Sequence, residues 1–365
     1  MYIQYIYKKV ADPLIPMSTR THKGRGAVSA PLGRFEQRPV ELDPEFEHER
    51  AQRAPETNLR AMQAGRIIST NDSPDVPFDQ SINPYQGCEH GCVYCYARPT
   101  HSYLDLSPGL DFETEIFYKP NASVRLLDEW EKKGYECKPI TIGANTDPYQ
   151  PAEKTLEITR SLLKLFLEHR HPVTLITKSH LVSRDLDLLV ELASMNLCSV
   201  AISVPTMNDD LKRIMEPRVP AASSRLKALS ELAASGVPTS ALIAPIIPAI
   251  NDDEIEAILE AVAEAGADQA RYIFLRLPHE LLDIFSAWLA EHFPERKDRV
   301  LSLVRQASGG RNYDSRFGAR QTGRGPYAEM LGRRFEAACR KLGLEADSYQ
   351  HALDCKRFLR PGQQQ

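Results

Sequence analysis

Residues 83–101, "NPYQGCEHGCVYCYARPTH", hold three of the seven cysteines of this 365-residue chain: Cys88, Cys92 and Cys95. Thiolates at this C-x3-C-x2-C spacing can converge on one metal centre when the loop wraps it, and Gly91 gives the backbone freedom to do so. A structural zinc site needs four ligands and a disulfide needs two, so a triplet leaves one coordination position without a protein ligand. The triplet therefore favours a [4Fe-4S] cluster with one open iron, where a cofactor or substrate can bind.

A zinc site is the alternative interpretation of the same loop. Its fourth ligand would be His90 or His101. His90 stands between two of the cysteines and is crowded for that role, whereas His101 is better placed. In this alternative the protein is a non-catalytic, zinc-stabilised binding module.

Downstream of the loop, short apolar segments alternate with amphipathic helical patterns at a spacing of roughly 30 residues. The predicted strands lie at 80–86, 138–145, 172–178, 198–206, 237–248 and 269–278. Such alternation is typical of βα units with buried parallel strands, which fit a doubly wound sheet or a βα barrel. Polar residues follow strand after strand, as in barrels, whereas a doubly wound sheet gathers them at one switch point. We therefore predict an α/β fold, a partial (β/α)6 TIM-type barrel.

We place this barrel at residues 76–292. Residues 1–75 are rich in Pro, Gly, Arg and Glu without a sustained period, so they predict an irregular arm, disordered in part. Residues 293–365 predict a mostly helical extension that covers the barrel mouth.

The composition is ordinary for a soluble globular protein, with 42% hydrophobic and 26% charged residues and a formal net charge of −4. This charge does not indicate nucleic-acid binding over the whole surface, although it allows a local basic patch. No apolar run approaches the ~20 residues that span a bilayer, and the first residues lack the order of a secretory signal. We expect a cytoplasmic protein in which cysteines such as Cys339 and Cys355 are inert thiols.

Five motifs along the chain resemble the radical S-adenosylmethionine (SAM) superfamily. They are "GCEHGCVYCYA", "NTDPYQPAE", "LITKSHLVSRDLDLL", "ISVPTMNDDLKRIMEP" and "APIIPAINDDEI", and they follow the spore photoproduct lyase-like (DNA repair photolyase-like) branch over residues 80–280. The resemblance implies a [4Fe-4S] cluster on Cys88, Cys92 and Cys95, with SAM on the open iron. It also implies a flavodoxin- or ferredoxin-type electron donor and a 5′-deoxyadenosyl radical that abstracts hydrogen from a substrate.

The resemblance further implies cofactor contacts near the strand ends. Lys178 would meet the SAM carboxylate, Thr146 and Asp147 its amino group, and Ser203 its ribose or carboxylate, while Tyr94 precedes the last cysteine as in the family. Ordinary structural alternatives are a solvated lysine, a turn and a serine bonded to its own backbone.

Tyr96 is the catalytic candidate, because it matches a tyrosine that takes part in hydrogen transfer in the lyase. The alternative is an aromatic side chain that covers the cluster. The hydrogen-donor cysteine of the lyase aligns with Ala144, so that thiol is absent and the lyase reaction does not follow from the fold. Cys137 and Cys198 precede their strands and are expected at the opposite end of the barrel.

An arginine-rich stretch near the C-terminus suggests where the substrate binds. Arg316 and Arg320 are interleaved with glycine and aromatic residues, and Arg276 ends the last predicted strand. Arginines among aromatic rings can hold phosphates and stack bases, although a solvated loop closing over the barrel mouth has the same composition. The predicted substrate is DNA or RNA, and the alternative is a peptide or small metabolite.

Overall fold

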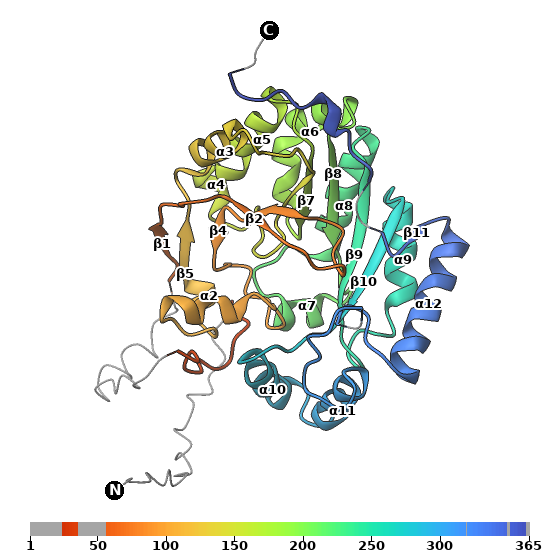
Figure 1. The fold of residues 1–365 in the computed structure, drawn as a ribbon. Coiled ribbons are helices and arrows are strands. Elements are labelled where there is room, and N and C mark those ends of the chain that lie inside the picture. The colour runs from red at the N-terminus through yellow and green to blue at the C-terminus, as the bar shows by residue number, and fades with distance from the viewer. Residues whose placement is uncertain (1–23, 36–55, 319, 349–350, 363–365) are drawn as a thin grey trace, which may run out of the picture.

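The computed structural model describes residues 24–35, 56–318, 320–348 and 351–362, arranged around one curved sheet (Figure 1). The sheet has eight strands in the order β11-β10-β9-β8-β7-β6-β3-β2. Their bounds are β2 Ile68–Thr70, β3 Gln80–Ile82, β6 Ile140–Ile142, β7 Val173–Thr177, β8 Cys198–Ser203, β9 Thr239–Ile246, β10 Gln269–Phe274 and β11 Glu345–Ala346. All neighbours pair in parallel except β2 and β3.

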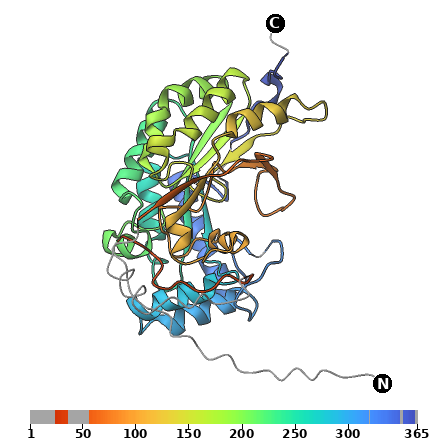
Figure 2. The same ribbon diagram turned by 90° about the vertical axis from the view of Figure 1, so that its left-hand side faces the viewer.

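The strands are apolar because both faces of the sheet are covered. Every residue of β8 is buried, and Figure 2 shows the helices stacked along one side of the sheet. The outer helices are α3 Ala122–Glu131, α5 Ile158–Glu168, α6 Leu186–Ser194, α8 Ala222–Ala234, α9 Ile255–Glu264 and α12 Pro326–Leu342. On α5, Leu162, Leu163 and Phe166 form one fully buried face.

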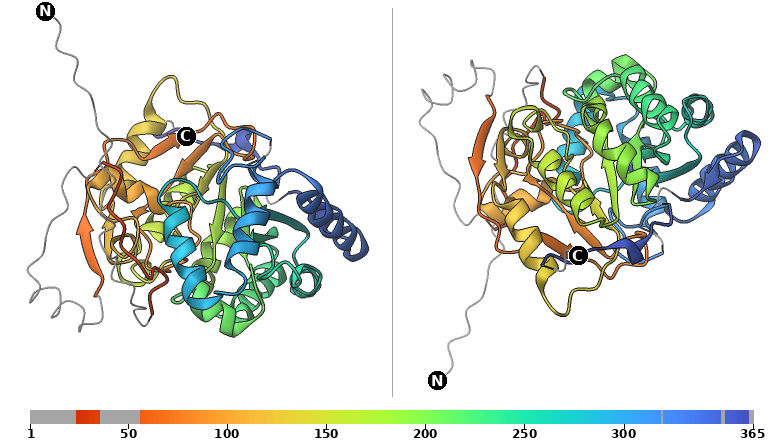
Figure 3. Two further views of the ribbon diagram at one scale, coloured as in Figure 1. Left: turned by 90° about the horizontal axis from the view of Figure 1, so that it is seen from below. Right: turned by 90° about the horizontal axis from the view of Figure 1, so that it is seen from above.

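The remaining elements lie at the ends and edges of the sheet. A second sheet, in the order β1-β5-β4, contains β1 Asn58–Ala61, β5 Glu115–Tyr118 and β4 Tyr85–Gln86. The short helices are η1 Arg98–Leu104, α2 Asp111–Thr114, α4 Glu153–Leu156, η2 His180–Asp185, α7 Asp209–Met215 and η3 Cys355–Arg357. The helices α10 Leu281–His292 and α11 Lys297–Ala307 lie across the lower end of the fold (Figure 3).

The predicted α/β partial barrel is confirmed: six parallel strands, β3 and β6 to β10, follow one another in chain order and the sheet stays open. The carboxyl ends of the strands point toward the lower end in Figure 1, because α7, which follows β8, lies there. None of the described helices is long and apolar enough to cross a membrane.

The segments outside the predicted barrel pack against it. Of the predicted arm, residues 1–23 and 36–55 lie outside the described residues, while residues 56–75 contain β1 and β2. Within the predicted extension, α12 packs on α9 and β11 pairs with β10. The last described segment runs to the amino-terminal end of the sheet, where the Leu359 N–H donates to the His169 carbonyl at 2.8 Å.

Candidate functional site

A cavity of about 430 Å³ opens at the carboxyl ends of the parallel strands. This volume falls within the range of roughly 300–1,000 Å³ that small-molecule sites occupy. All the site residues predicted from the sequence line this cavity except Thr146 and Arg316. Carboxyl strand ends are where the βα loops meet, so residues from distant motifs converge there.

The three cysteines come from the loop that follows β4. Gly87 and Gly91 have positive φ angles of 83° and 66°, which turn the loop without the steric cost that a Cβ would bring. Cys88 and Cys92 are each 7% exposed, and all three sulfur-bearing residues line the cavity. Burial raises the pKa of all three thiols, so a metal that binds here must displace their protons.

His90 in this loop and His101 in η1 each contact another group through one ring nitrogen. His101 Nε2 lies 3.0 Å from the Glu115 carbonyl oxygen, and His90 Nδ1 lies 3.3 Å from Asp147 Oδ2. Across the described ranges, no three or more Cys, His, Asp or Glu side chains gather around a position for a single metal ion. A [4Fe-4S] cluster binds each thiolate to a different iron, so its cysteines need no such common point.

Asp147 connects the cysteine loop to the end of β7. Its carboxylate accepts hydrogen bonds from Thr177 Oγ1 and from the Lys178 backbone N–H, both at 2.7 Å, and contacts His90. Burial acts to raise the pKa of Asp147, but His90 and these hydrogen bonds outweigh it and lower that pKa. The carboxylate is thus held charged and fixes the backbone where Lys178 begins.

Lys178 presents an ammonium to the cavity. Its Nζ lies 2.6 Å from Ser203 Oγ, 3.3 Å from the Ala244 carbonyl oxygen and 3.3 Å from Glu216 Oε1. It also stands 5.6 Å from the centre of the Tyr94 ring. A cation held by several acceptors at a cavity wall is suited to receive a ligand carboxylate.

Glu216 and Arg225, for which the sequence predicted no role, form a fully buried ion pair. Glu216 also accepts a hydrogen bond from the Tyr94 hydroxyl and lies 4.0 Å from Cys92 Sγ. Burial acts to raise the pKa of Glu216, but Arg225 and Lys178 outweigh it and lower that pKa to about 2. Glu216 directly follows α7, in which four of the seven residues are charged, so no local pattern marks its burial.

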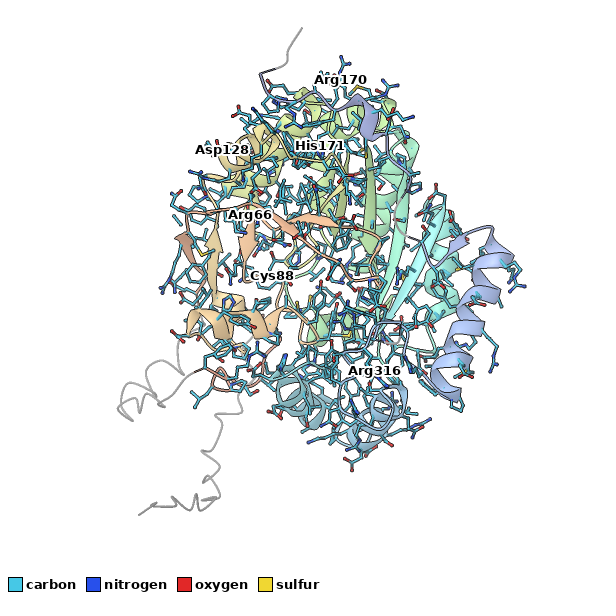
Figure 4. All side chains as sticks on the ribbon, viewed as in Figure 1. Arg66, Cys88, Asp128, Arg170, His171 and Arg316 are labelled. Carbon is cyan, nitrogen blue, oxygen red and sulfur yellow. The ribbon has the colours of Figure 1, made fainter. Side chains whose placement is uncertain are left out.

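Two predicted residues do not reach the cavity. Thr146 is buried, and its hydroxyl donates to the Tyr85 carbonyl at 2.7 Å. Arg316 pairs with Asp314 at 2.7 Å, is largely exposed and lies apart from Cys88 in Figure 4.

The cavity mouth combines arginines with aromatic rings. The Tyr96 hydroxyl donates to the carbonyl of Ala144, and the Tyr96 ring lies 5.3 Å from the guanidinium of Arg276. Arg276 Nη2 also lies 3.3 Å from the Tyr313 hydroxyl. In the described part of the chain, Arg276 contacts these tyrosines and no carboxylate, whereas Arg320 pairs with Asp75 at 2.5 Å.

Residues 24–33, which we call the strap, cover the outer side of the cysteine loop. Glu113, fully buried and paired with Arg98 at 2.5 Å, accepts hydrogen bonds from the Gly26 and Ala27 N–H groups at 3.0 and 2.8 Å. A Cβ at Gly26 would stand 1.8 Å from the Gly91 carbonyl oxygen. Only glycine therefore fits where the strap meets the loop.

The chain matches the sequence family described as the radical SAM superfamily over residues 82–262. It is 34% identical over 233 residues to the uncharacterized protein Rv2578c of Mycobacterium tuberculosis, covering 63% of this chain and 68% of that protein. It is 30% identical over 214 residues to the uncharacterized protein MJ0683 of Methanocaldococcus jannaschii, covering 59% and 76%.

Among solved structures, the fold is similar to spore photoproduct lyases. A mutant with bound AdoMet and dinucleoside spore photoproduct matches with a TM-score of 0.58 and 16% identity, covering 86% of this chain and 88% of that chain. The lyase complexed with dinucleoside spore photoproduct matches with a TM-score of 0.57 and 15% identity over the same shares. At these identities the likeness concerns the fold. Together the comparisons confirm the family resemblance read from the five motifs.

Proposed function

Because the chain belongs to the radical SAM superfamily, whose members are enzymes that use a [4Fe-4S] cluster and SAM, we propose that Cys88, Cys92 and Cys95 bind that cluster. The observation that carries this proposal is the convergence of the three cysteines and Lys178 on one cavity. The residues fit the group: Cys88 and Cys92 are buried, Cys95 is partly buried, and all three line the cavity, so three cysteine ligands leave one iron open to a ligand. When bound, the reduced cluster supplies the electron that cleaves SAM to methionine and a 5′-deoxyadenosyl radical.

The residues of the chain then bind and orient SAM. Lys178 and Ser203 receive its carboxylate. The buried Tyr94 ring contacts the ammonium of Lys178. Asp147 acts by fixing the backbone at the end of β7, because its oxygens already accept hydrogen bonds from that strand. We assign Thr146 to the support of the same loop, since its hydroxyl donates to the Tyr85 carbonyl.

The substrate enters at the mouth formed by Tyr96, Arg276 and Arg320. Among the described residues, Arg276 contacts tyrosine rings and no carboxylate, so it can receive an anionic group and stack on a base, which favours DNA or RNA. Tyr96 is the candidate for hydrogen transfer, because its hydroxyl reaches the carbonyl of Ala144, where the lyase has its donor cysteine. A peptide or small metabolite with an anionic group is the alternative substrate.

The electron comes from an external donor of the flavodoxin or ferredoxin type. A low-potential cluster and an external reductant suit the reducing cytoplasm, which we propose as the location of the protein.

Anaerobic reconstitution tests the cluster assignment. The wild type should bind about four irons per chain and turn brown, since thiolate-to-iron charge transfer absorbs near ~400 nm. Cys88→Ala, Cys92→Ala and Cys95→Ala should each lose this iron, while Cys198→Ala, a buried thiol on β8, should keep it. Iron retained by all three loop variants contradicts the assignment.

Product analysis then tests the chemistry. With dithionite and SAM, the reconstituted enzyme should form 5′-deoxyadenosine. Deuterium transfer into that product from labelled DNA, RNA or peptide identifies the substrate class. Transfer from peptide alone would contradict the nucleic-acid assignment.

A further inference from the structure

Glu216 is a buried carboxylate that contacts both the cysteine loop and Lys178 but does not line the cavity. Its side chain is fully buried and absent from the described cavity wall. On one side it contacts the cysteine loop, through the Tyr94 hydroxyl and the Cys92 sulfur. On the other it lies 3.3 Å from the ammonium of Lys178. It therefore connects the cysteine loop to the proposed carboxylate site.

The charges around Glu216 do not balance. One carboxylate stands between two cations, Arg225 and Lys178. Arg225 is fully buried and is also fixed by the carbonyls of Pro220 and Ser203 at 2.9 and 3.0 Å. Of these two cations, Lys178 is the one that reaches the cavity, where its side chain is 17% exposed.

Three other charged groups line the cavity with Lys178: Asp147, Arg276 and Arg320. Asp147 comes from the loop after β6, accepts hydrogen bonds from Thr177 Oγ1 and from the Lys178 backbone N–H, and contacts His90. Arg276 and Arg320 line the same cavity and are positive. Arg320 is already paired with Asp75, so a ligand carboxylate that enters the cavity meets the ammonium of Lys178 at the wall.

Glu216 also restricts the direction of the ammonium. A lysine ammonium has three N–H donors; here it donates to Ser203 Oγ and the Ala244 carbonyl and forms an ion pair with Glu216 Oε1, which leaves one donor for a ligand. Without Glu216 the long side chain would regain rotamer freedom that must be lost again when a ligand binds. Glu216 thus removes part of the entropic cost of binding before the ligand arrives.

We propose that Glu216 is a positioning residue for the SAM carboxylate: it holds Lys178 and Tyr94 in place and couples them to the cysteine loop. This inference rests on the proposed function, in which Lys178 receives that carboxylate. It assigns Glu216 no contact with SAM.

The test compares two ligands on the reconstituted protein. SAM carries the carboxylate, whereas decarboxylated SAM keeps the sulfonium and an amine but lacks it. Glu216→Gln should weaken SAM binding about tenfold to a hundredfold, the loss expected for one charge-assisted hydrogen bond. Its affinity for decarboxylated SAM should equal that of the wild type, and its iron content and visible spectrum should be unchanged.

A double variant separates positioning from simple charge neutralisation. In Glu216→Gln/Arg225→Met no unpaired buried charge remains, so the fold should tolerate it better than the single change. We expect this variant to keep the selective loss of SAM affinity. If it binds SAM as tightly as the wild type, Glu216 serves only to neutralise Arg225 and the inference is wrong.

Two further variants keep the conclusions distinct. Glu113→Gln changes the other fully buried Glu–Arg pair and should leave the preference for SAM over decarboxylated SAM unchanged. Lys178→Met should abolish that preference. If Lys178→Met does not change the preference for SAM over decarboxylated SAM, the proposed carboxylate site is wrong. If Lys178→Met lowers that preference while the double variant does not, only the role of Glu216 is wrong.

Discussion

Two buried Glu–Arg pairs flank the cysteine loop, Glu216–Arg225 beneath the cavity and Glu113–Arg98 beneath the strap, and all four side chains have 0% exposure. Besides its pairing with Arg98, the Glu113 carboxylate accepts hydrogen bonds from the backbone N–H groups of Gly26 and Ala27.

Besides its pairing with Arg225, the Glu216 carboxylate accepts a hydrogen bond from the Tyr94 hydroxyl and forms an ion pair with Lys178, a cation that faces the cavity. The Glu113–Arg98 pair therefore holds the strap, whereas the Glu216–Arg225 pair contacts a lysine that faces the ligand cavity. The third partner makes the difference.

The largest effect should come from breaking either pair. Glu113→Ala and Glu216→Ala each leave a buried guanidinium without its carboxylate, which costs about 3–5 kcal/mol of unfolding free energy. Denaturant unfolding of the apoprotein measures this cost. We expect both variants to lose a similar unfolding free energy and only Glu216→Ala to lose SAM affinity. An equal loss of SAM affinity in the two variants would contradict the difference proposed between the two pairs.

A smaller effect should follow from displacing the strap. Gly26→Ala puts a Cβ 1.8 Å from a backbone oxygen of Gly91, so the strap must shift, at a cost of about 1–3 kcal/mol. Hydrogen exchange of residues 24–33 should become faster. Gly65→Ala is the matched control, because its Cβ would meet nothing within 4 Å. Unchanged exchange in Gly26→Ala would show that the strap is not fastened there.

The pH dependence of stability sharpens the comparison further. The pKa of Glu216 falls from 4.5 to about 2 on folding, so the unfolded chain takes up its proton first as the solution is acidified. The stability that this carboxylate contributes is present above pH 4.5 and is lost as the pH falls through about 2. Apoprotein unfolding between these pH values should therefore depend less on pH in Glu216→Gln/Arg225→Met. Equal slopes would contradict the contacts described for Glu216.

The smallest effect should come from an exposed pair. Arg316 pairs with Asp314 but is 57% exposed and does not line the cavity, so solvent screens the interaction. Arg316→Ala should change neither unfolding nor SAM affinity measurably. A loss of SAM affinity in this variant would give the arginine a role that its position does not support.

The barrel and the cysteine loop could be predicted because their signals are local. The βα alternation and the cysteine spacing each lie within short stretches, and Lys178 and Ser203 end strands whose carboxyl ends must meet. Thr146 has the same kind of position, yet its hydroxyl points to the Tyr85 carbonyl. Strand-end position selects candidates but does not fix the direction of a side chain.

The two buried pairs could not be predicted because their partners are set by tertiary packing. Arg225 lies in a helical pattern whose polar residues are ordinarily solvated, and its burial depends on the carboxylate at Glu216. The strap has a composition typical of an irregular segment, and its hydrogen bond to Glu113 spans 87 residues. No local period carries such information.

The most direct test of the central claim is the visible and electron paramagnetic resonance spectrum of the reconstituted protein, recorded with and without SAM. The account predicts a [4Fe-4S] spectrum that SAM perturbs in the wild type, is perturbed only at higher SAM concentration in Lys178→Met, and is lost in Cys92→Ala. A Cys92→Ala protein with an unchanged, SAM-sensitive cluster spectrum would contradict it.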